Sequence, residues 1–418
     1  MKKRYDSYKP SGIDWIGDIP SHWTVCRIKD CFILKTGTTP KGFDKPINDN
    51  EINWFTPSDI SSSGTILQEA DRKLSENLIN KEGISLFPQK SLIFVGIGAT
   101  AGKLGFAEVA GYSNQQITGL IPKTCCSKYY FYYLCHDSKR VRDNASFTTL
   151  PIINNSYLSQ VYWVMPPLAE QEAIAAWLDE KCEDIDAAIA KVDREIELID
   201  ELKQSEISRV VTRGLNPDAP LRPSGIDWIG DIPKHWKMCR FKNFMYLKTT
   251  PSVSDIKVGL ENLESGSGKF IESDTEFEGN GVEFCTNNIL YGKLRPYLKK
   301  VWLAEFSGNA IGDFFVFSNC PNSNASYLKY VLLSDGFTKQ ADGSTFGAKM
   351  PRVSSEFILT LPFYLPPLAE QQAIADYLDK KCAEIDGLKA KLNRKRETLT
   401  ELRQSIISEV VTGKRKVI

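Results

Sequence analysis

The segment from Pro166 to Thr212 reads PPLAEQEAIAAWLDEKCEDIDAAIAKVDREIELIDELKQSEISRVVT. It returns at Pro366 to Thr412 with 28 identities in 47 positions, so the chain contains an internal repeat. Each copy opens on two prolines, which stop the preceding structure and suit the first turn of a helix, where the missing N–H has no partner to lose. We therefore expect a helix to begin at each Pro-Pro pair.

Apolar residues recur every three or four positions along the first copy, which is the spacing of a coiled-coil seam. We expect this seam to contain Ile185, Ile189, Val192, Ile196, Ile199, Leu202 and Val210. The second copy keeps Ile385, Leu392, Leu399, Leu402 and Val410 but has Lys389 and Arg396 in place of two isoleucines. At about 1.5 Å per residue, each helix would be about 70 Å long if unbroken.

The two predicted helices carry opposite charge. Residues 166–213 hold 6 basic and 13 acidic side chains, whereas residues 366–418 hold 11 basic and 8 acidic ones. This contrast predicts an antiparallel pair in which Lys389 and Arg396 meet acidic groups of the other helix. A nucleic-acid patch or a localisation signal at residues 389–396 is the alternative interpretation.

A second repeat precedes each helix. Pro10 to Lys29 returns as Pro223 to Lys242 with 16 identities in 20 positions, but 213 positions later instead of 200. The intervening segments therefore differ in length as well as in sequence. They carry short apolar runs typical of strands, at residues 91–95 and 314–317, and short helices at 129–134 and 327–333.

These repeats define the expected fold. We predict two mixed α/β (α+β) domains joined by two long antiparallel coiled-coil helices in a pseudo-two-fold dumbbell. The predicted bounds are 1–165 for the first domain, 166–213 for the first helix, 214–365 for the second domain and 366–418 for the second helix.

The composition is that of a globular protein with no overall field for nucleic acid. Among 418 residues, 42% are hydrophobic and 25% charged, and 52 basic side chains balance 52 acidic ones. No stretch has the length and apolar character of a signal peptide or a membrane span, so we expect a cytoplasmic protein without a membrane partner. Three histidines and no C-x-x-C spacing argue against a zinc site.

The sequence also lacks a recognisable catalytic motif. The run from Gly96 to Leu104, GIGATAGKL, resembles a phosphate-binding loop but has one residue too few before Gly-Lys and no Ser or Thr after it. Two interpretations remain for it, a glycine turn between strands and a loop that approaches a ligand such as DNA. His22 and His235 occupy equivalent repeat positions beside tryptophans, which favours a structural role.

The most specific motifs are Tyr8–Trp23 with its second copy and Pro-Pro-Leu-Ala-Glu-Gln at 166–171 and 366–371, followed by the shorter segments 37–40, 113–116, 294–298 and 349–352. In these motifs the chain resembles HsdS, the DNA-specificity subunit of type I restriction-modification systems. The resemblance implies two target-recognition domains, each reading half of a split, double-stranded DNA sequence. It also implies helices that set the spacing and dock two methyltransferase subunits, with restriction or motor subunits as further partners.

The family's specificity subunit has no active site, so the resemblance implies a non-catalytic chain. The resemblance also implies that this chain binds no cofactor itself and that S-adenosylmethionine, ATP and Mg bind to the partner subunits. Two alternatives are a specificity subunit for a fused restriction-methylation polypeptide and a coiled-coil adaptor that does not bind DNA.

Candidate DNA contacts are local, because residues 1–165 carry only four surplus basic side chains and residues 214–365 carry none. Lysines and arginines would contact phosphates, and arginine and glutamine could also donate to base edges, although solvated lysines and ordinary glutamine hydrogen bonds are the alternative. The candidates are Thr38, Thr39, Lys41, Thr100, Lys103, Gln115, Gln116, Lys293, Arg295, Tyr297, Lys299, Lys300, Lys349 and Arg352.

Overall fold

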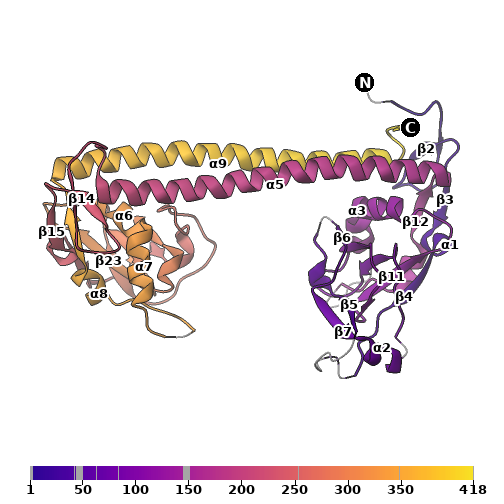
Figure 1. Cartoon of the computed structure of the whole chain (residues 1–418), viewed down its shortest axis with the longest axis horizontal. Helices are drawn as coiled ribbons and strands as arrows, with labels where there is room; N and C mark the ends of the chain where they lie inside the picture. The colour runs from indigo at the N-terminus through magenta and orange to yellow at the C-terminus, as the bar shows by residue number, and fades with distance from the viewer. Residues whose placement is uncertain are drawn as a thin grey trace. The chain divides into compact units, whose positions relative to one another are not determined.

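The computed structural model describes residues 3–41, 43, 50–62, 64–82, 84–144, 151–252, 254–347 and 349–417. The chain divides into two compact units, Met1–Lys191 with Lys395–Ile418, and Val192–Arg394. Each unit therefore contains one globular domain and a part of both long helices, which are labelled α5 (Leu168–Arg213) and α9 (Leu368–Val411) in Figure 1.

The domain of the first unit is built on a five-stranded sheet in the order β4-β11-β8-β9-β6. A second sheet has three strands in the order β10-β5-β7. Its elements are β1 (Tyr8–Pro10), β2 (Asp18–Pro20), β3 (Thr24–Arg27), α1 (Ile28–Cys31), β4 (Phe32–Thr36), β5 (Glu51–Phe55), η1 (Pro57–Asp59), β6 (Thr65–Leu67), β7 (Arg72–Ser75), α2 (Glu76–Glu82), β8 (Leu92–Val95), β9 (Leu104–Ala107), β10 (Tyr112–Ser113), β11 (Ile117–Pro122), α3 (Ser127–Asp143), α4 (Asn155–Gln160) and β12 (Tyr162–Met165). The predicted strand at 91–95 is confirmed as β8, and the helix predicted at 129–134 is longer than expected.

The domain of the second unit has a four-stranded sheet in the order β16-β23-β20-β21 and another in the order β17-β19-β22-β18. Its elements are β13 (Leu221–Pro223), β14 (Asp231–Pro233), β15 (Lys237–Arg240), η2 (Phe241–Asn243), β16 (Met245–Lys248), β17 (Pro251–Ser252), β18 (Lys257–Val258), η3 (Leu260–Asn262), β19 (Gly281–Phe284), β20 (Ile289–Gly292), η4 (Pro296–Leu298), β21 (Val301–Leu303), β22 (Gly308–Ala310), β23 (Phe314–Asn319), α6 (Ala325–Leu333), α7 (Asp335–Gly343), α8 (Ser355–Thr360) and β24 (Pro362–Leu365). β23 and α6 confirm the strand and helix predicted at 314–317 and 327–333.

Each domain buries the beginning of one long helix and the end of the other. In the first unit, Ile174 and Leu178 of α5 share one core with Ile407, Val410 and Val411 of α9. In the second unit, Ile374 and Leu378 of α9 share a core with Ile207, Val210 and Val211 of α5. The burial of large apolar side chains from separate elements is what holds helix and domain together.

Matching tyrosines fix the helix ends to these cores. The Tyr129 hydroxyl, on α3, donates to the Val411 carbonyl at 2.8 Å, and the Tyr327 hydroxyl, on α6, donates to the Val211 carbonyl at 3.1 Å. Both tyrosines are fully buried. Each bond satisfies a carbonyl in the last turn of a helix, where no intrahelical partner is available.

The Pro-Pro-Leu-Ala-Glu-Gln motif is a helix start that also docks on the domain. The Gln171 side chain donates to the Pro166 carbonyl at 2.8 Å and accepts from the Cys126 N–H at 3.0 Å, just before α3. Gln371 makes the equivalent bonds, to Pro366 at 2.9 Å and from Asn324 at 2.8 Å. The predicted helix starts after both proline pairs are confirmed.

The preceding glutamates join the two repeated motifs. His22 lies 2.8 Å from Glu170 and His235 lies 2.7 Å from Glu370, in each case between Nε2 and a carboxylate oxygen. The second carboxylate oxygen accepts from the Tyr5 hydroxyl in the first unit and from the indole of Trp236 in the second. These contacts are consistent with the structural role predicted for both histidines.

The two long helices are antiparallel within the second unit. Lys389 pairs with Asp200, with 2.6 Å between Nζ and a carboxylate oxygen, and Lys203 pairs with Asp386 at 2.7 Å. From Asp200 to Lys203 along α5, the paired residue of α9 changes from Lys389 to Asp386, so the two helices run in opposite directions. The contact predicted for Lys389 with an acidic group of the other helix is thereby confirmed.

The predicted seam is wrong at Leu202 and Leu402. As whole residues they are 56% and 45% exposed, whereas the adjacent residue Lys203 is 7% exposed. The Arg403 side chain is 14% exposed and pairs with Asp186, with 2.9 Å between Nε and Oδ1. Basic side chains take the inward positions because their aliphatic stems pack while their charged ends reach an aspartate of the other helix.

None of the described helices is both long and apolar enough to cross a membrane.

Candidate nucleic-acid interface

In the first unit, three loops meet at one edge of the five-stranded sheet. β11 is antiparallel to both β4 and β8, so β4 and β8 end where β11 begins. Backbone bonds join the loops there, with Thr38 N–H donating to Ser113 O at 2.9 Å and Gly96 N–H donating to Gln116 O at 2.8 Å. A Cβ on Gly37 would lie 2.3 Å from two carbonyl oxygens of the 113–114 turn, so only glycine allows this approach.

This edge brings together four of the candidate residues. The Thr39 hydroxyl donates to the Gln115 side-chain oxygen at 2.8 Å, so the amide nitrogen of this exposed side chain is the group left to donate. Thr38, Thr39 and Gln115 are exposed, and Gln116 is half-buried, with its side-chain oxygen 3.2 Å from the Asn114 amide nitrogen. Lys41 is exposed in the same loop as the threonines.

Asn155 connects α4 to this sheet edge by two hydrogen bonds and was not predicted from the sequence. Its amide donates to the Thr36 hydroxyl at 2.9 Å, and its carbonyl oxygen accepts from the Thr118 hydroxyl at 2.8 Å. It therefore ties α4 to the ends of β4 and β11, immediately before the exposed loops. Only its position after the helix-capping Asn154 could have singled it out.

Thr100 and Lys103 lie in the turn between β8 and β9, as the first interpretation of the glycine-rich run predicts. Gly98 and Gly102 have φ values of +104° and +95°, which non-glycine residues rarely adopt. The Lys103 ammonium donates to the Ile60 carbonyl at 2.7 Å. Thr100 and Lys103 also line a cavity of about 530 Å³ with Lys139 and Arg142 of α3, two cations that the sequence analysis did not select.

In the second unit, the equivalent sheet edge carries charged side chains. β23 is antiparallel to β16 and β20, so the segment after β20 lies beside the start of β23. Lys293 N–H donates to Asp313 O at 2.9 Å and Arg295 N–H donates to Pro351 O at 2.8 Å. The segments 293–295 and 349–352, which are far apart in the sequence, thus form one surface.

An aspartate organises the cations of this surface. Arg352 donates two hydrogen bonds to Asp313, at 3.0 and 2.9 Å, and Lys293 lies 3.7 Å from the same carboxylate. The hydrogen bonds from Arg352 hold the pKa of the Asp313 carboxyl below its usual value, although partial burial opposes this effect. Two cations around one carboxylate leave a net positive charge at the edge.

Further side chains on this edge project into solvent. Arg295 and Lys349 are exposed. Tyr297, at 51% exposure, instead lines a cavity that the domain forms with α5 and α9. Arg295 has φ +51°, a left-handed conformation that is uncommon for a residue with a side chain. Phe346 and Met350, at 63% and 55% exposure, add apolar surface that the sequence analysis missed.

Lys299 and Lys300 point into the unit instead. The Lys299 ammonium pairs with Asp335 and donates to the Gln204 side chain of α5 at 2.6 Å. The Lys300 ammonium donates to the Leu260 carbonyl at 2.5 Å. The structure thus gives both lysines partners inside the protein.

The part of the chain that the structure describes contains no group of three or more His, Cys, Asp and Glu side chains arranged to hold a metal ion. The two edges instead offer hydroxyl, amide, guanidinium and ammonium donors. Hydroxyl and amide donors dominate in the first unit, and cationic donors dominate in the second.

Comparison with known proteins gives a consistent result. A family model described as type I restriction modification DNA specificity domain matches residues 20–198 and 263–395. The chain is 21% identical to the type I restriction enzyme EcoDI specificity subunit of Escherichia coli, over 95% of this chain and 89% of that protein. It is 23% identical to the MjaVIII specificity subunit of Methanocaldococcus jannaschii, over 96% of this chain and 94% of the relative.

Solved structures share the fold. A chain from a structure on complex assembly and conformational transition of the type I R-M system matches with a TM-score of 0.70 and 13% identity, covering 94% of this chain and 98% of that one. The HsdS subunit of Thermoanaerobacter tengcongensis matches with a TM-score of 0.50 and 14% identity, over the same shares of both chains.

Proposed function

This chain belongs to the type I restriction modification DNA specificity family, and from that premise we propose that its two domains read the two halves of an asymmetric, bipartite DNA sequence. The predicted bounds of the recognition domains are residues 1–165 and 214–365. The specificity role itself follows from the family. The proposal is that each domain reads a different half-site.

The observation that carries this proposal is that equivalent sheet edges present different donors. The first edge offers the amide of Gln115, and the second offers Arg295 and Lys349. Amide side chains suit adenine, arginine suits guanine, and ammonium groups suit phosphates. A symmetric target would need the same donors at both edges. Two different sets favour two different half-sites.

We further propose that the chain is not itself an enzyme and that methylation and cleavage reside on its partners. The relatives are specificity subunits, and two methyltransferase subunits and the restriction or motor subunits would supply the catalytic groups. S-adenosylmethionine, ATP and Mg would bind to those partners. The helices α5 and α9 are the proposed docking elements and the spacer between half-sites.

A domain exchange tests the division of labour. Residues 31–165 are replaced by the equivalent segment of a relative, and the methylated sequences of the host genome are determined with each chain. We expect one half of the methylated sequence to change while the other half stays constant. A change in both halves would overturn the two-reader proposal.

Two alternatives differ in measurable ways. A specificity subunit that serves a fused restriction-methylation polypeptide would copurify with one large partner instead of separate subunits. A coiled-coil adaptor would show no preference for duplex DNA in a salt-dependent gel shift with the methyltransferase subunit present. We expect separate partners and a duplex preference.

A further inference from the structure

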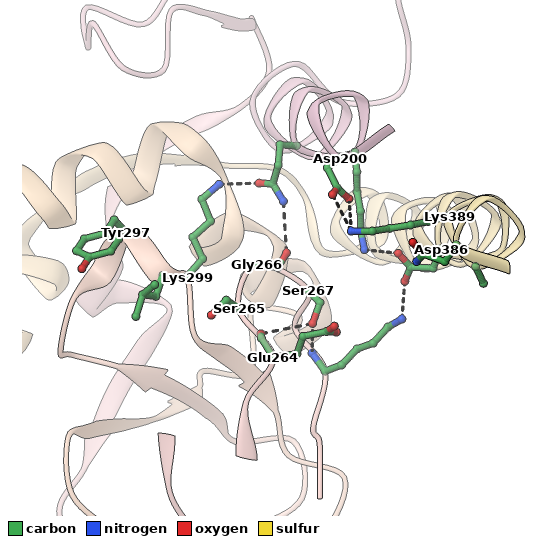
Figure 2. A pocket seen from close by; sticks show the side chains of 15 residues that line it. Asp200, Glu264, Ser265, Gly266, Ser267, Tyr297, Lys299, Asp386 and Lys389 are labelled. Atoms are coloured by element: carbon green, nitrogen blue, oxygen red, sulfur yellow. Dashed lines mark hydrogen bonds and ion pairs between the residues drawn. The ribbon is translucent and has the colours of Figure 1, made fainter. Parts of the chain in front are cut away.

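A cavity of about 530 Å³ in the second unit lies where the recognition domain meets the two long helices (Figure 2). The domain contributes the turn 264–269 and the residues around Tyr297 and Lys299. α5 contributes Asp200, Lys203 and Gln204, and α9 contributes the segment from Asp386 to Asn393. Polar and charged side chains thus link the domain to both helices.

Asp386 is the centre of this contact. Its carboxylate lies 2.7 Å from the ammonium of Lys203 on α5 and 2.5 Å from the ammonium of Lys269 on the domain. The Lys203 side chain is 8% exposed, so its charge depends on this partner, whereas the Lys269 side chain is 54% exposed. One carboxylate therefore joins α9, α5 and the recognition domain.

A second link runs beside it. Gln204 of α5 accepts from the Lys299 ammonium at 2.6 Å and donates to the Gly266 carbonyl at 3.3 Å. Both partners belong to the domain, and Lys299 also pairs with Asp335 at the start of α7. Figure 2 shows the Lys299 and Asp386 contacts on two sides of the same cavity.

The repeat provides an internal comparison. Asp186 and Arg403 occupy the positions equivalent to Asp386 and Lys203, and they pair in the first unit at 2.9 Å. In the described part of the first domain, no basic side chain joins this pair, and the Asp186 side chain is 52% exposed against 24% for Asp386. The helix-to-helix contact is common to both units, and at this position a domain lysine joins it in the second unit.

We propose that Asp386 is a positioning residue for DNA recognition: through Lys269 it holds the second recognition domain at a fixed orientation on the helix pair. This inference rests on the proposed function, because orientation matters only if the domain reads a half-site. The aspartate need not contact DNA. It fixes the direction in which the edge formed by residues 293–295 and 349–352 faces.

The decisive variant is Lys269→Ala, because it removes the domain link and leaves the buried pair of Lys203 and Asp386 intact. Asp386→Asn removes both contacts, and Asp386→Glu is the conservative rescue. Asp186→Asn is the matched control, since it breaks the equivalent helix pair without a domain contact. Thermal unfolding of each purified chain establishes which variants fold.

The readout is the methylation rate of the complete complex on DNA targets whose half-sites are separated by the native spacer or by one base pair more or less. Wild type should strongly prefer the native spacer. We expect Lys269→Ala and Asp386→Asn to reduce this preference by about tenfold, since a small displacement at a binding site changes rates by such factors. Asp386→Glu and Asp186→Asn should retain it.

The outcomes distinguish a failure of the proposed function from a failure of the positioning role of Asp386. If wild type methylates no asymmetric bipartite target, the proposed function fails. If wild type does so and folded Lys269→Ala keeps the full spacer preference, Asp386 does not position the domain and the inference is overturned. Loss of preference in Asp186→Asn as well would assign the effect to the helix pair alone and would also overturn it.

Discussion

Lys389 donates hydrogen bonds to both carboxylate oxygens of Asp200, at 2.8 and 2.6 Å. The repeat-equivalent positions in the first unit hold Ile189 and Thr400. The same place in the duplicated helix pair is therefore charged in one unit and uncharged in the other. This difference makes the pair a defined test of how charge contributes to helix association.

Transferring the uncharged combination to the second unit should change stability little. The Lys389 and Asp200 side chains are 37% and 49% exposed, and exposed ion pairs contribute about 0 to 1 kcal/mol. We expect Lys389→Ile with Asp200→Thr to unfold near the wild-type denaturant concentration. The coupling energy from the two single variants and the double variant should be below about 1 kcal/mol. A coupling above about 2 kcal/mol would contradict this expectation.

Asp386 should make the stability of the second unit depend on acid. Its burial opposes ionisation, but the hydrogen bonds and charges of Lys203 and Lys269 outweigh it and hold the pKa of this carboxyl below its ordinary value. A lowered pKa means that the carboxylate stabilises the folded state above the unfolded pKa of about 4. That contribution is lost as the pH falls through the folded pKa.

Calorimetry of wild type and Asp386→Asn between about pH 3 and pH 7 checks this sign. The difference in melting temperature should be largest at neutral pH and should shrink below about pH 4. A difference that stays constant over the whole range would show that the ionised carboxylate is not responsible. Asp186→Asn is the control for the general loss of an aspartate from the helix pair.

The exposed and the engaged cations should behave differently in DNA binding. We expect Arg295→Ala to weaken binding by the complete complex through a lost base contact, and Lys349→Ala to weaken it and lower the salt slope by about 1 through a lost phosphate contact. Lys300→Ala should leave the slope unchanged and lower the melting temperature, because its ammonium donates to the Leu260 carbonyl. Equal slopes for wild type and Lys349→Ala, together with a reduced slope for Lys300→Ala, would reverse this assignment.

Shortening both helices by one heptad should abolish methylation at the native site. Deleting residues 189–195 and 394–400 preserves the seam period and retains the Asp186–Arg403, Lys203–Asp386 and Asp200–Lys389 pairs. Each helix loses about 10 Å, or about 3 base pairs of DNA, which also turns one half-site by about 100° around the duplex.

Activity should reappear only on targets with an altered spacer. Methylation of synthetic targets with a series of spacer lengths measures this, after binding of the methyltransferase subunit confirms that the deletion variant is folded. Wild-type rates at the native spacer would mean that the helices do not determine the distance between half-sites.

The architecture followed from the repeats because helix starts and seams depend on local sequence. The Pro-Pro pairs mark the starts of α5 and α9, and the apolar run at 91–95 lies in a buried strand. The prediction failed at Leu202 and Leu402, because a rule based on apolar residues alone assigns leucine to the seam instead of the basic residue that follows it. It could not foresee that Asp386 stands opposite Lys203, because that pairing depends on a register between helices 183 residues apart.

The candidate site was predictable in location but not in detail. The segments 37–40, 113–116, 294–298 and 349–352 were selected from motifs, and the fold gathers them at equivalent sheet edges. The availability of each cation was not predictable. Lys299 and Lys103 find partners 95 and 43 residues away, and such long-range partners leave no trace in local spacing.

The first domain shares its core with Ile407, Val410 and Val411, and this has a consequence for biosynthesis. A ribosome that has finished β12 at Met165 has not yet made the side chains that complete that core. At about 5 to 20 residues per second, the missing helix end arrives roughly 10 to 50 s later. During that interval the apolar surface around Tyr129 lacks the end of α9, so we expect the nascent domain to depend on chaperones or on rapid completion of the chain. A premature stop after the second domain would therefore damage the first domain, which is translated in full, as well as removing α9.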